Sequence, residues 1–262
     1  MPRFPLGISD LARAVRSTLI GQVRLMDMQL GVTLDDIVTT VLDDRPDILG
    51  VSATFGQHDL LVGLLDAVGE LSEPPLVLAG GSLTARNERL LLRRYPWLLI
   101  ARGAGEPTIA DVLAYWHGDL DLPQVRGIGY IGTAHGTGRM RALAVGNYRK
   151  TATMANRAQT DIFPELDLLA TTFDHRGVAQ LESSRGCTNY CSFCPRGHKG
   201  SWSGTDPGAL SWIIRAIAEV FDLYPEVSRT LYLVDEEFID RGPDAVPRAL
   251  AVADVLHAAC SG

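Results

Sequence analysis

The chain has 262 residues, of which 46% are hydrophobic and 21% charged, and its formal net charge is −7. This composition is typical of a globular protein that buries a core, and the length allows about two domains. The negative charge and the lack of a basic run argue against nucleic acid or a membrane surface as partner, and no apolar run is long enough to span a bilayer. Four cysteines without a secretory leader predict a reducing, cytoplasmic setting.

Residues 1–120 alternate between helical and strand-like patterns. We expect helices at 9–19, 34–42, 58–71, 86–94 and 107–116, and strands at 22–28, 48–54, 75–79 and 97–101. Ser9 is expected to cap the first helix, and the apolar run 48–54 is typical of a buried parallel strand. Strands that alternate with helices favour parallel pairing, so this half predicts an α/β domain with a doubly wound parallel sheet.

Three loops follow these strands at the edge where ligands bind in such sheets. Their candidate ligand contacts are Ser52, Thr54 and Phe55, then Gly80, Gly81 and Ser82, and then Gly103, Gly105 and Glu106. Glycine lets a backbone approach a ligand closely, and amides at a helix N-terminus can bind phosphate. Ordinary turn chemistry explains any one of these loops equally well. The order of all three along the chain is a more specific signal of a ligand site than any single loop.

Residues 121–177 predict a connector. Two strand-like segments, 127–131 and 139–145, flank the turn at 135–138 and predict a hairpin. The polar, irregular stretch 147–164 predicts a linker.

A second α/β pattern occupies residues 178–262. We expect strands at 178–182 and 229–234 and helices at 206–224 and 246–259, with Asp206 as N-cap and Pro207 at the first helical position. The second strand ends in the acidic run Asp235–Glu236–Glu237. This run is either a ligand-binding loop or a solvated acidic loop.

Between the first of these strands and its helix lies the sequence RGCTNYCSFCPRGH, residues 185–198. Cys187, Cys191 and Cys194 have the spacing C-x3-C-x2-C, and their thiolates suit a cuboidal iron–sulfur cluster with one iron left open to a small molecule. A zinc site of the three cysteines and His198 is an alternative. Disulfides fit poorly, and Cys260, in an apolar helical stretch, reads as a buried hydrophobe.

The cysteine spacing, with Phe193 before the last cysteine, resembles the cluster loop of the radical S-adenosylmethionine (SAM) enzymes. The resemblance implies a [4Fe-4S] cluster that binds SAM at its open iron and cleaves it to a 5′-deoxyadenosyl radical. It also implies that Phe193 flanks adenine and that Asp235 and Glu236 hold the SAM amino group. Residues 178–262 would then be the first two βα units of a partial TIM barrel.

The earlier segments PLGISDLARAVR, QVRLMD and RGAGEPT, with Ser52 and the Gly80–Gly81 pair, resemble the cobalamin (vitamin B12)-binding domain that precedes radical SAM domains. This implies that residues 1–120 are a Rossmann-like cobalamin domain and that the loop residues named above contact cobalamin. The Asp-x-His-x-x-Gly motif that supplies a lower axial histidine is absent, and His58 is a weaker candidate for that position. An initial strand typical of relatives is expected to be missing.

Together the resemblances imply a cobalamin-dependent radical SAM enzyme, foremost a C-methyltransferase with methylcobalamin as methyl donor. The alternatives are a radical SAM enzyme for cyclisation or rearrangement, and a non-catalytic module that binds cobalamin or a cluster. Because the family's barrel has about six βα units, we expect a truncated chain. Its expected partners are a small-molecule or peptide substrate and an electron donor such as flavodoxin or ferredoxin.

Overall fold

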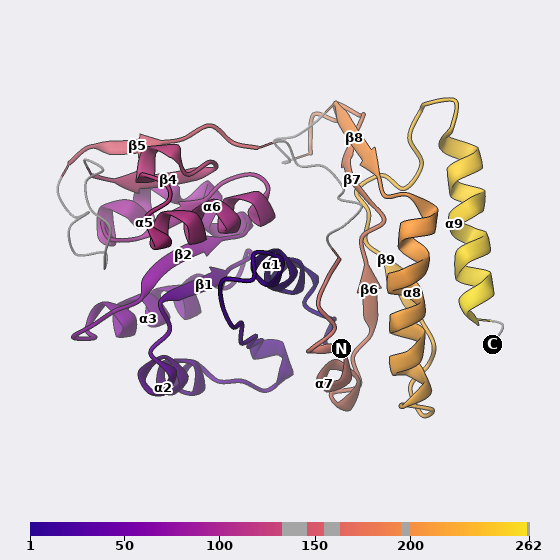
Figure 1. The fold of residues 1–262 in the computed structure, drawn as a ribbon, viewed down its shortest axis with the longest axis horizontal. Coiled ribbons are helices and arrows are strands. Elements are labelled where there is room, and N and C mark those ends of the chain that lie inside the picture. The colour runs from indigo at the N-terminus through magenta and orange to yellow at the C-terminus, as the bar shows by residue number, and fades with distance from the viewer. Residues whose placement is uncertain (133–145, 155–162, 195–199, 261–262) are drawn as a thin grey trace. The chain divides into compact units, whose positions relative to one another are not determined.

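The computed structural model describes residues 1–132, 146–154, 163–194 and 200–260 (Figure 1). The chain divides into two compact units. One comprises Ala14–Met154 and is called the sheet unit here; the other comprises Met1–Arg13 and Ala155–Gly262 and is called the cysteine unit. Helix α1, Leu6–Ser17, runs from one to the other. The domain boundaries expected near residues 120 and 177 stay predictions.

The described residues of the sheet unit form one five-stranded sheet with strands in sequence order. The strands are β1 (Ile48–Ser52), β2 (Leu76–Gly80), β3 (Leu99–Ala101), β4 (Ile128–Ile131) and β5 (Tyr148–Lys150). The first three pair in parallel, whereas β4 and β5 are antiparallel to their neighbours. The α/β architecture is confirmed, but the sheet is mixed rather than purely parallel.

Of the helices that lie wholly within the described residues of this unit, one precedes β1 and the others follow β1, β2 and β3. They are α2 (Leu34–Asp44), α3 (His58–Gly69), α4 (Ser82–Arg86), α5 (Glu88–Arg94) and α6 (Gly105–His117), with 3₁₀ turns at Met28–Leu30 and Leu122–Gln124. Thr33 and Asp36 form a capping box at the start of α2. Leucines of α3 and α5 pack with the buried faces of β2 and β3 in one apolar core.

Four details of the predicted elements are wrong. No strand forms within 22–28, because Asp27 instead caps the 3₁₀ turn by accepting the Gln29 N–H. Ser9 lies inside α1, where its hydroxyl donates to the Pro5 carbonyl. The helix expected at 86–94 begins two residues later, as α5, and a separate short helix that was not expected, α4, precedes it. Strand β1 is only partly buried, because it is an edge strand of the described sheet.

The connector also differs from the expected hairpin. Its first strand, β4, forms as predicted and pairs with β3, so it extends the sheet. The second predicted strand, 139–145, lies outside the described residues, and β4 pairs on its other side with β5.

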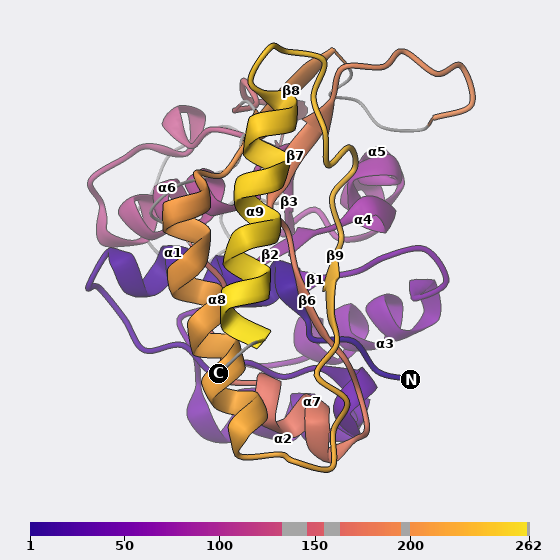
Figure 2. The same cartoon turned by 90° about the vertical axis from the view of Figure 1, so that its right-hand side faces the viewer.

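In its described residues, the cysteine unit combines two small sheets with the first part of α1 and three further helices. Strands β6 (Ala179–Leu181) and β9 (Leu231–Leu233) are parallel, and β7 (Ser184–Cys187) and β8 (Ser201–Gly204) form an antiparallel hairpin. The helices are α7 (Leu169–Asp174), α8 (Pro207–Asp222) and α9 (Ala245–Cys260), and α8 and α9 lie side by side (Figure 2). The predicted strand–loop–helix–strand–helix order is confirmed.

Local signals explain these elements. Asp206 caps α8 by accepting the Ala209 N–H at 3.1 Å, and Pro207 occupies the first helical position, as predicted. The N-terminal segment joins the same unit, since Arg3 pairs in parallel with Val178 and the Phe4 side chain is fully buried.

Gly81 lies at the junction of β2 and α4 with φ +93°. A Cβ there would lie 2.3 Å from the Ala53 carbonyl oxygen, and this oxygen also accepts the Leu83 N–H. The loops after β1 and β2 therefore touch through their backbones, and only glycine fits the contact.

We expect Gly81→Ala to lower the free energy of unfolding by about 2–3 kcal/mol, since it combines a left-handed φ with a backbone clash. Urea unfolding followed by circular dichroism measures this. Gly50→Ala is the matched control, because a Cβ at Gly50 meets no atom within 4 Å. If both variants lowered the free energy of unfolding equally, the close contact with Ala53 would not be the cause of the effect at Gly81.

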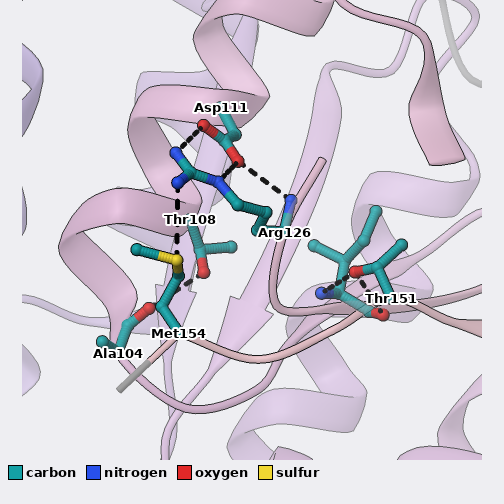
Figure 3. Close-up of polar contacts among 7 residues, drawn as sticks. Ala104, Thr108, Asp111, Arg126, Thr151 and Met154 are labelled. Carbon is teal, nitrogen blue, oxygen red and sulfur yellow. Dashed lines mark hydrogen bonds and ion pairs between the residues drawn. The ribbon is translucent and has the colours of Figure 1, made fainter. Parts of the chain in front are cut away.

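An ion pair joins α6 to the segment that leads into β4 (Figure 3). Arg126 Nε and Nη2 donate to the two Asp111 carboxylate oxygens at 2.6 and 2.7 Å, and the Arg126 main-chain N–H adds a bond of 2.9 Å. The Arg126 side chain lowers the pKa of Asp111, against the opposing effect of burial.

The folded-state pKa of Asp111 is below its ordinary value of about 3.9, so the pair stabilises the fold above about pH 4. That contribution is lost as the pH falls through the lower folded pKa. We expect Asp111→Asn to reduce stability at pH 7 and to flatten the acid limb of a stability–pH profile measured by urea unfolding. Asp119→Asn, at an exposed position just after α6, is the matched control and should leave both nearly unchanged.

Candidate functional site

The cysteine loop begins at the end of the β7–β8 hairpin. Cys187 is the last residue of β7, and its carbonyl accepts the Gly200 N–H at 2.8 Å, so the base of the loop is closed. All three loop cysteines are free thiols; Cys191 is exposed, and Cys187 and Cys194 are partly exposed. The Cys194 N–H donates to the Cys191 carbonyl at 3.2 Å. The sequence places these thiols in one loop, but the hairpin below them was not predicted.

Gly186 explains how tightly the two strands of this hairpin approach. It has φ +87°, and a Cβ there would lie 2.1 Å from the Ser201 carbonyl oxygen. The residue before the first cysteine must therefore be glycine, and the close pairing fixes the backbone at Cys187.

Asp235, directly after β9, binds the segment between β6 and β7. Its Oδ1 accepts the main-chain N–H groups of Ser183 and Ser184, each at 2.6 Å, and its Oδ2 accepts the Ser183 hydroxyl at 2.7 Å. The predicted SAM contact at Asp235 thus belongs to a carboxylate that already accepts three hydrogen bonds from the chain.

Glu237 binds the first residues of the cysteine loop itself. Its Oε2 accepts the Thr188 N–H at 2.8 Å and the Thr188 hydroxyl at 3.0 Å, and its Oε1 accepts the Asn189 side-chain amide at 2.7 Å. Burial opposes ionisation of Glu237, but hydrogen bonds from Thr188, Cys187 and Asn189 together lower its pKa. Sequence reasoning named the acidic run but did not single out Glu237.

Arg248 reaches from α9 to the same region. Its guanidinium donates to the carbonyls of Ser183 at 2.5 Å, Thr205 at 3.2 Å and Phe238 at 3.3 Å. Trp202 and Phe238 each contact its cationic face, with centroid distances of 5.1 and 5.8 Å. Burial lowers the pKa of Arg248, and Asp235 opposes that effect. No sequence signal marked this arginine.

The donor set suits the predicted cluster, because three free thiols on one short loop are the usual ligands of iron–sulfur centres. Among the described residues, no three His, Cys, Asp or Glu side chains are arranged around a single metal ion. His198, needed for the zinc alternative, lies outside the described residues. Phe193 is 87% exposed and Glu236 is partly buried, and both stay predicted SAM contacts.

The predicted cobalamin contacts lie along one edge of the sheet unit. Ser52 is paired with Gly80 across β1 and β2, and both strands, with β3, end at the same edge. Ser52, Thr54, Phe55, Gly81, Ser82 and Gly103 are exposed there, Gly80 and Gly105 are partly exposed, and Glu106 is buried. The structure brings the three predicted loops together, while the contact of each residue with cobalamin stays a prediction.

Two side chains at this edge have partners of their own. The Arg86 guanidinium lies 5.2 Å from the ring centroid of Phe55, which is 59% exposed. His58 lies in the first turn of α3, and its Nδ1 is 3.0 Å from Asp59 Oδ1. The role of His58 as a lower axial ligand stays a prediction.

Comparison with known proteins relates the chain to cobalamin-dependent radical SAM enzymes. The chain is 31% identical over 271 aligned positions to 4′-phospho-dehydrooxetanocin synthase of Priestia megaterium, covering 98% of this chain and 34% of that protein. The structure of OxsB, a cobalamin-dependent S-adenosylmethionine radical enzyme, with aqua-cobalamin bound superimposes with a TM-score of 0.85 at 28% identity, covering 98% of this chain and 35% of OxsB. No protein-family model matches the chain.

The methyltransferase TsrM from Kitasatospora setae shares the fold, with a TM-score of 0.68 at 16% identity; the match covers all of this chain and 49% of TsrM. The chain belongs to the family of cobalamin-dependent radical SAM enzymes. Within that family it is similar to 4′-phospho-dehydrooxetanocin synthase and spans about a third of the length of that protein. None of the helices in the described part of the chain has the length and apolar character needed to cross a bilayer.

We expect Arg248→Lys to lower the free energy of unfolding by about 2–3 kcal/mol, because a single ammonium cannot replace a guanidinium that bonds three carbonyls between two aromatic rings. Thermal or urea unfolding measures this. Arg215→Lys, at an exposed position on α8, is the matched control and should stay within about 0.5 kcal/mol. An unchanged free energy of unfolding in Arg248→Lys would show that these contacts do not stabilise the unit.

Proposed function

We propose that this chain carries the cluster-, SAM- and cobalamin-binding part of a cobalamin-dependent radical SAM enzyme. The observation that carries the proposal is the loop of three free thiols on the β7–β8 hairpin, held by the acidic segment after β9. Family membership supports it. A structure of OxsB contains aqua-cobalamin and S-adenosylmethionine, and a structure of TsrM contains cobalamin and a [4Fe-4S] cluster.

Cys187, Cys191 and Cys194 would hold the cluster, whose fourth iron stays open for SAM. When bound, these groups supply one-electron chemistry on SAM and organometallic chemistry on cobalamin. The chain's own residues orient them. Exposed Phe193 flanks adenine, and Glu236 holds the amino group. Asp235 adds to this through the one acceptor position of about four that its three hydrogen bonds leave open.

In the sheet unit, cobalamin would bind at the carboxyl edge of β1, β2 and β3. The backbone contact between Gly81 and Ala53 holds the first two loops close together at this edge. Exposed Ser52, Thr54 and Ser82 offer hydroxyl groups to the nucleotide tail. Exposed Phe55 offers an apolar surface beside Arg86. This accounts for small and polar residues where the strands end.

The reaction remains a proposal, because the chain spans only part of its relatives. The sequence relative at 31% identity is named a synthase, whereas methyl transfer is named for TsrM, whose 16% identity supports the fold alone. We therefore place rearrangement or cyclisation of a small-molecule or peptide substrate ahead of C-methyl transfer. Free thiols in the loop suit a reducing cytoplasm, where flavodoxin or ferredoxin can supply the electron.

Anaerobic reconstitution of the full chain with iron and sulfide tests the cluster. We expect about four irons per chain, a broad absorption that bleaches on reduction, and a severalfold lower iron content in Cys191→Ala. Cys260→Ala, outside the loop, is the matched control and should keep wild-type iron. A chain that binds one zinc ion and no iron or sulfide would refute the proposal.

The same preparation, given SAM, cobalamin and a reductant, separates the alternatives. Release of 5′-deoxyadenosine supports radical chemistry, and additional S-adenosylhomocysteine indicates methyl transfer. A loaded chain that binds cobalamin and cleaves no SAM would be a non-catalytic binding module.

A further inference from the structure

An asparagine in the cysteine loop faces the sulfur of the first cysteine. The main-chain N and the side-chain Nδ2 of Asn189 each lie 3.4 Å from Cys187 Sγ. These distances are within the range of N–H···S hydrogen bonds. Cys187 thus has two donors from one residue, and the second of them depends on the direction in which the amide points.

The neighbours of Asn189 fix that direction. Its Nδ2 lies 2.7 Å from Glu237 Oε1, and its Oδ1 accepts a hydrogen bond from the Arg241 guanidinium. A flipped amide would place oxygen against the carboxylate and NH₂ against the guanidinium, and both contacts would be repulsive. Since the amide nitrogen has two hydrogens, one can bond Glu237 and the other can bond Cys187.

Glu237 is itself held from several sides. Its Oε2 accepts two bonds from Thr188, and its main-chain carbonyl accepts the Ser184 hydroxyl at 2.9 Å and the Trp202 indole N–H at 2.6 Å. The carboxylate that orients Asn189 therefore belongs to the hairpin framework. A hydrogen bond from Asn189 to the sulfur is pre-arranged before any cluster binds.

Hydrogen bonds to a cluster sulfur stabilise the reduced cluster, because it carries the more negative charge, and so raise the reduction potential. We propose that Asn189 is a positioning residue that donates to Cys187 Sγ and raises the reduction potential of the cluster, with Glu237 and Arg241 orienting its amide. The inference rests on the proposed function, since it requires the cluster.

The test is an EPR-monitored redox titration of the anaerobically reconstituted full chain. Asn189→Ala removes the side-chain donor and keeps the main-chain one, so we expect a lower midpoint potential at near wild-type iron content. Asn189→Asp has nearly the same shape but replaces the donor with a carboxylate, and it should shift the potential further down. Ser192→Ala, at an exposed position of the same loop, is the matched control.

A second measurement tests whether Glu237 acts through Asn189. If it does, the shift caused by Asn189→Ala should be smaller in a Glu237→Ala background than in the wild type. A purely structural role for both residues would lower iron content and leave the potential of the loaded fraction unchanged.

The outcomes separate the two proposals. A wild-type cluster whose potential is the same in Asn189→Ala and Asn189→Asp overturns this inference and leaves the proposed function standing. Absence of iron from the wild type overturns both. If Asn189→Ala takes up no iron, the titration is made on Asn189→Ser, which keeps a short donor. A midpoint potential below that of the wild type then supports the inference, whereas a wild-type potential, or no iron in this variant either, overturns it.

Discussion

The cysteine unit depends on one electrostatic arrangement, in which the acidic segment after β9 binds the chain at both ends of β7. Asp235 holds the entrance to β7, and Glu237 holds the first residues beyond Cys187. Each carboxylate accepts hydrogen bonds from main-chain N–H groups that have no partner in a neighbouring strand at these positions. An N–H group left without a partner in a partly buried site would destabilise the fold. A parallel pair of strands and a cysteine loop thereby become one framework.

Arg248 completes this framework. The two carboxylates bind main-chain N–H groups, whereas the Arg248 guanidinium binds main-chain carbonyls. It binds the Ser183 carbonyl, while Asp235 binds the Ser183 N–H and hydroxyl, so one short segment is held at both of its polar ends. In the sheet unit, backbone contacts rather than side chains hold the loops in place, because Gly81, which has no side chain, packs against the Ala53 backbone. Two loops with different chemistry are thus fixed by different means.

Much of the fold followed from local signals in the sequence. Asp206 and Pro207 placed the start of α8, and short apolar runs placed β2, β6 and β9. The remainder depends on contacts distant in sequence: the β7–β8 hairpin brings Cys187 against Ser201, and Arg248 binds the Ser183 carbonyl, 65 positions earlier. The cysteines were evident from spacing, whereas Glu237 and Asn189 gain their positions only from tertiary structure.

The assignment of Met1–Arg13 to the cysteine unit has a consequence for the order in which the two units fold. Phe4 is buried with residues near position 178, and Asp10 pairs with Arg185, which lies 175 positions later, so these contacts close a very long loop. Residues 14–154 make their contacts within one contiguous segment, so they can collapse before that loop closes. In refolding from denaturant, the cysteine unit is therefore expected to form after the sheet unit.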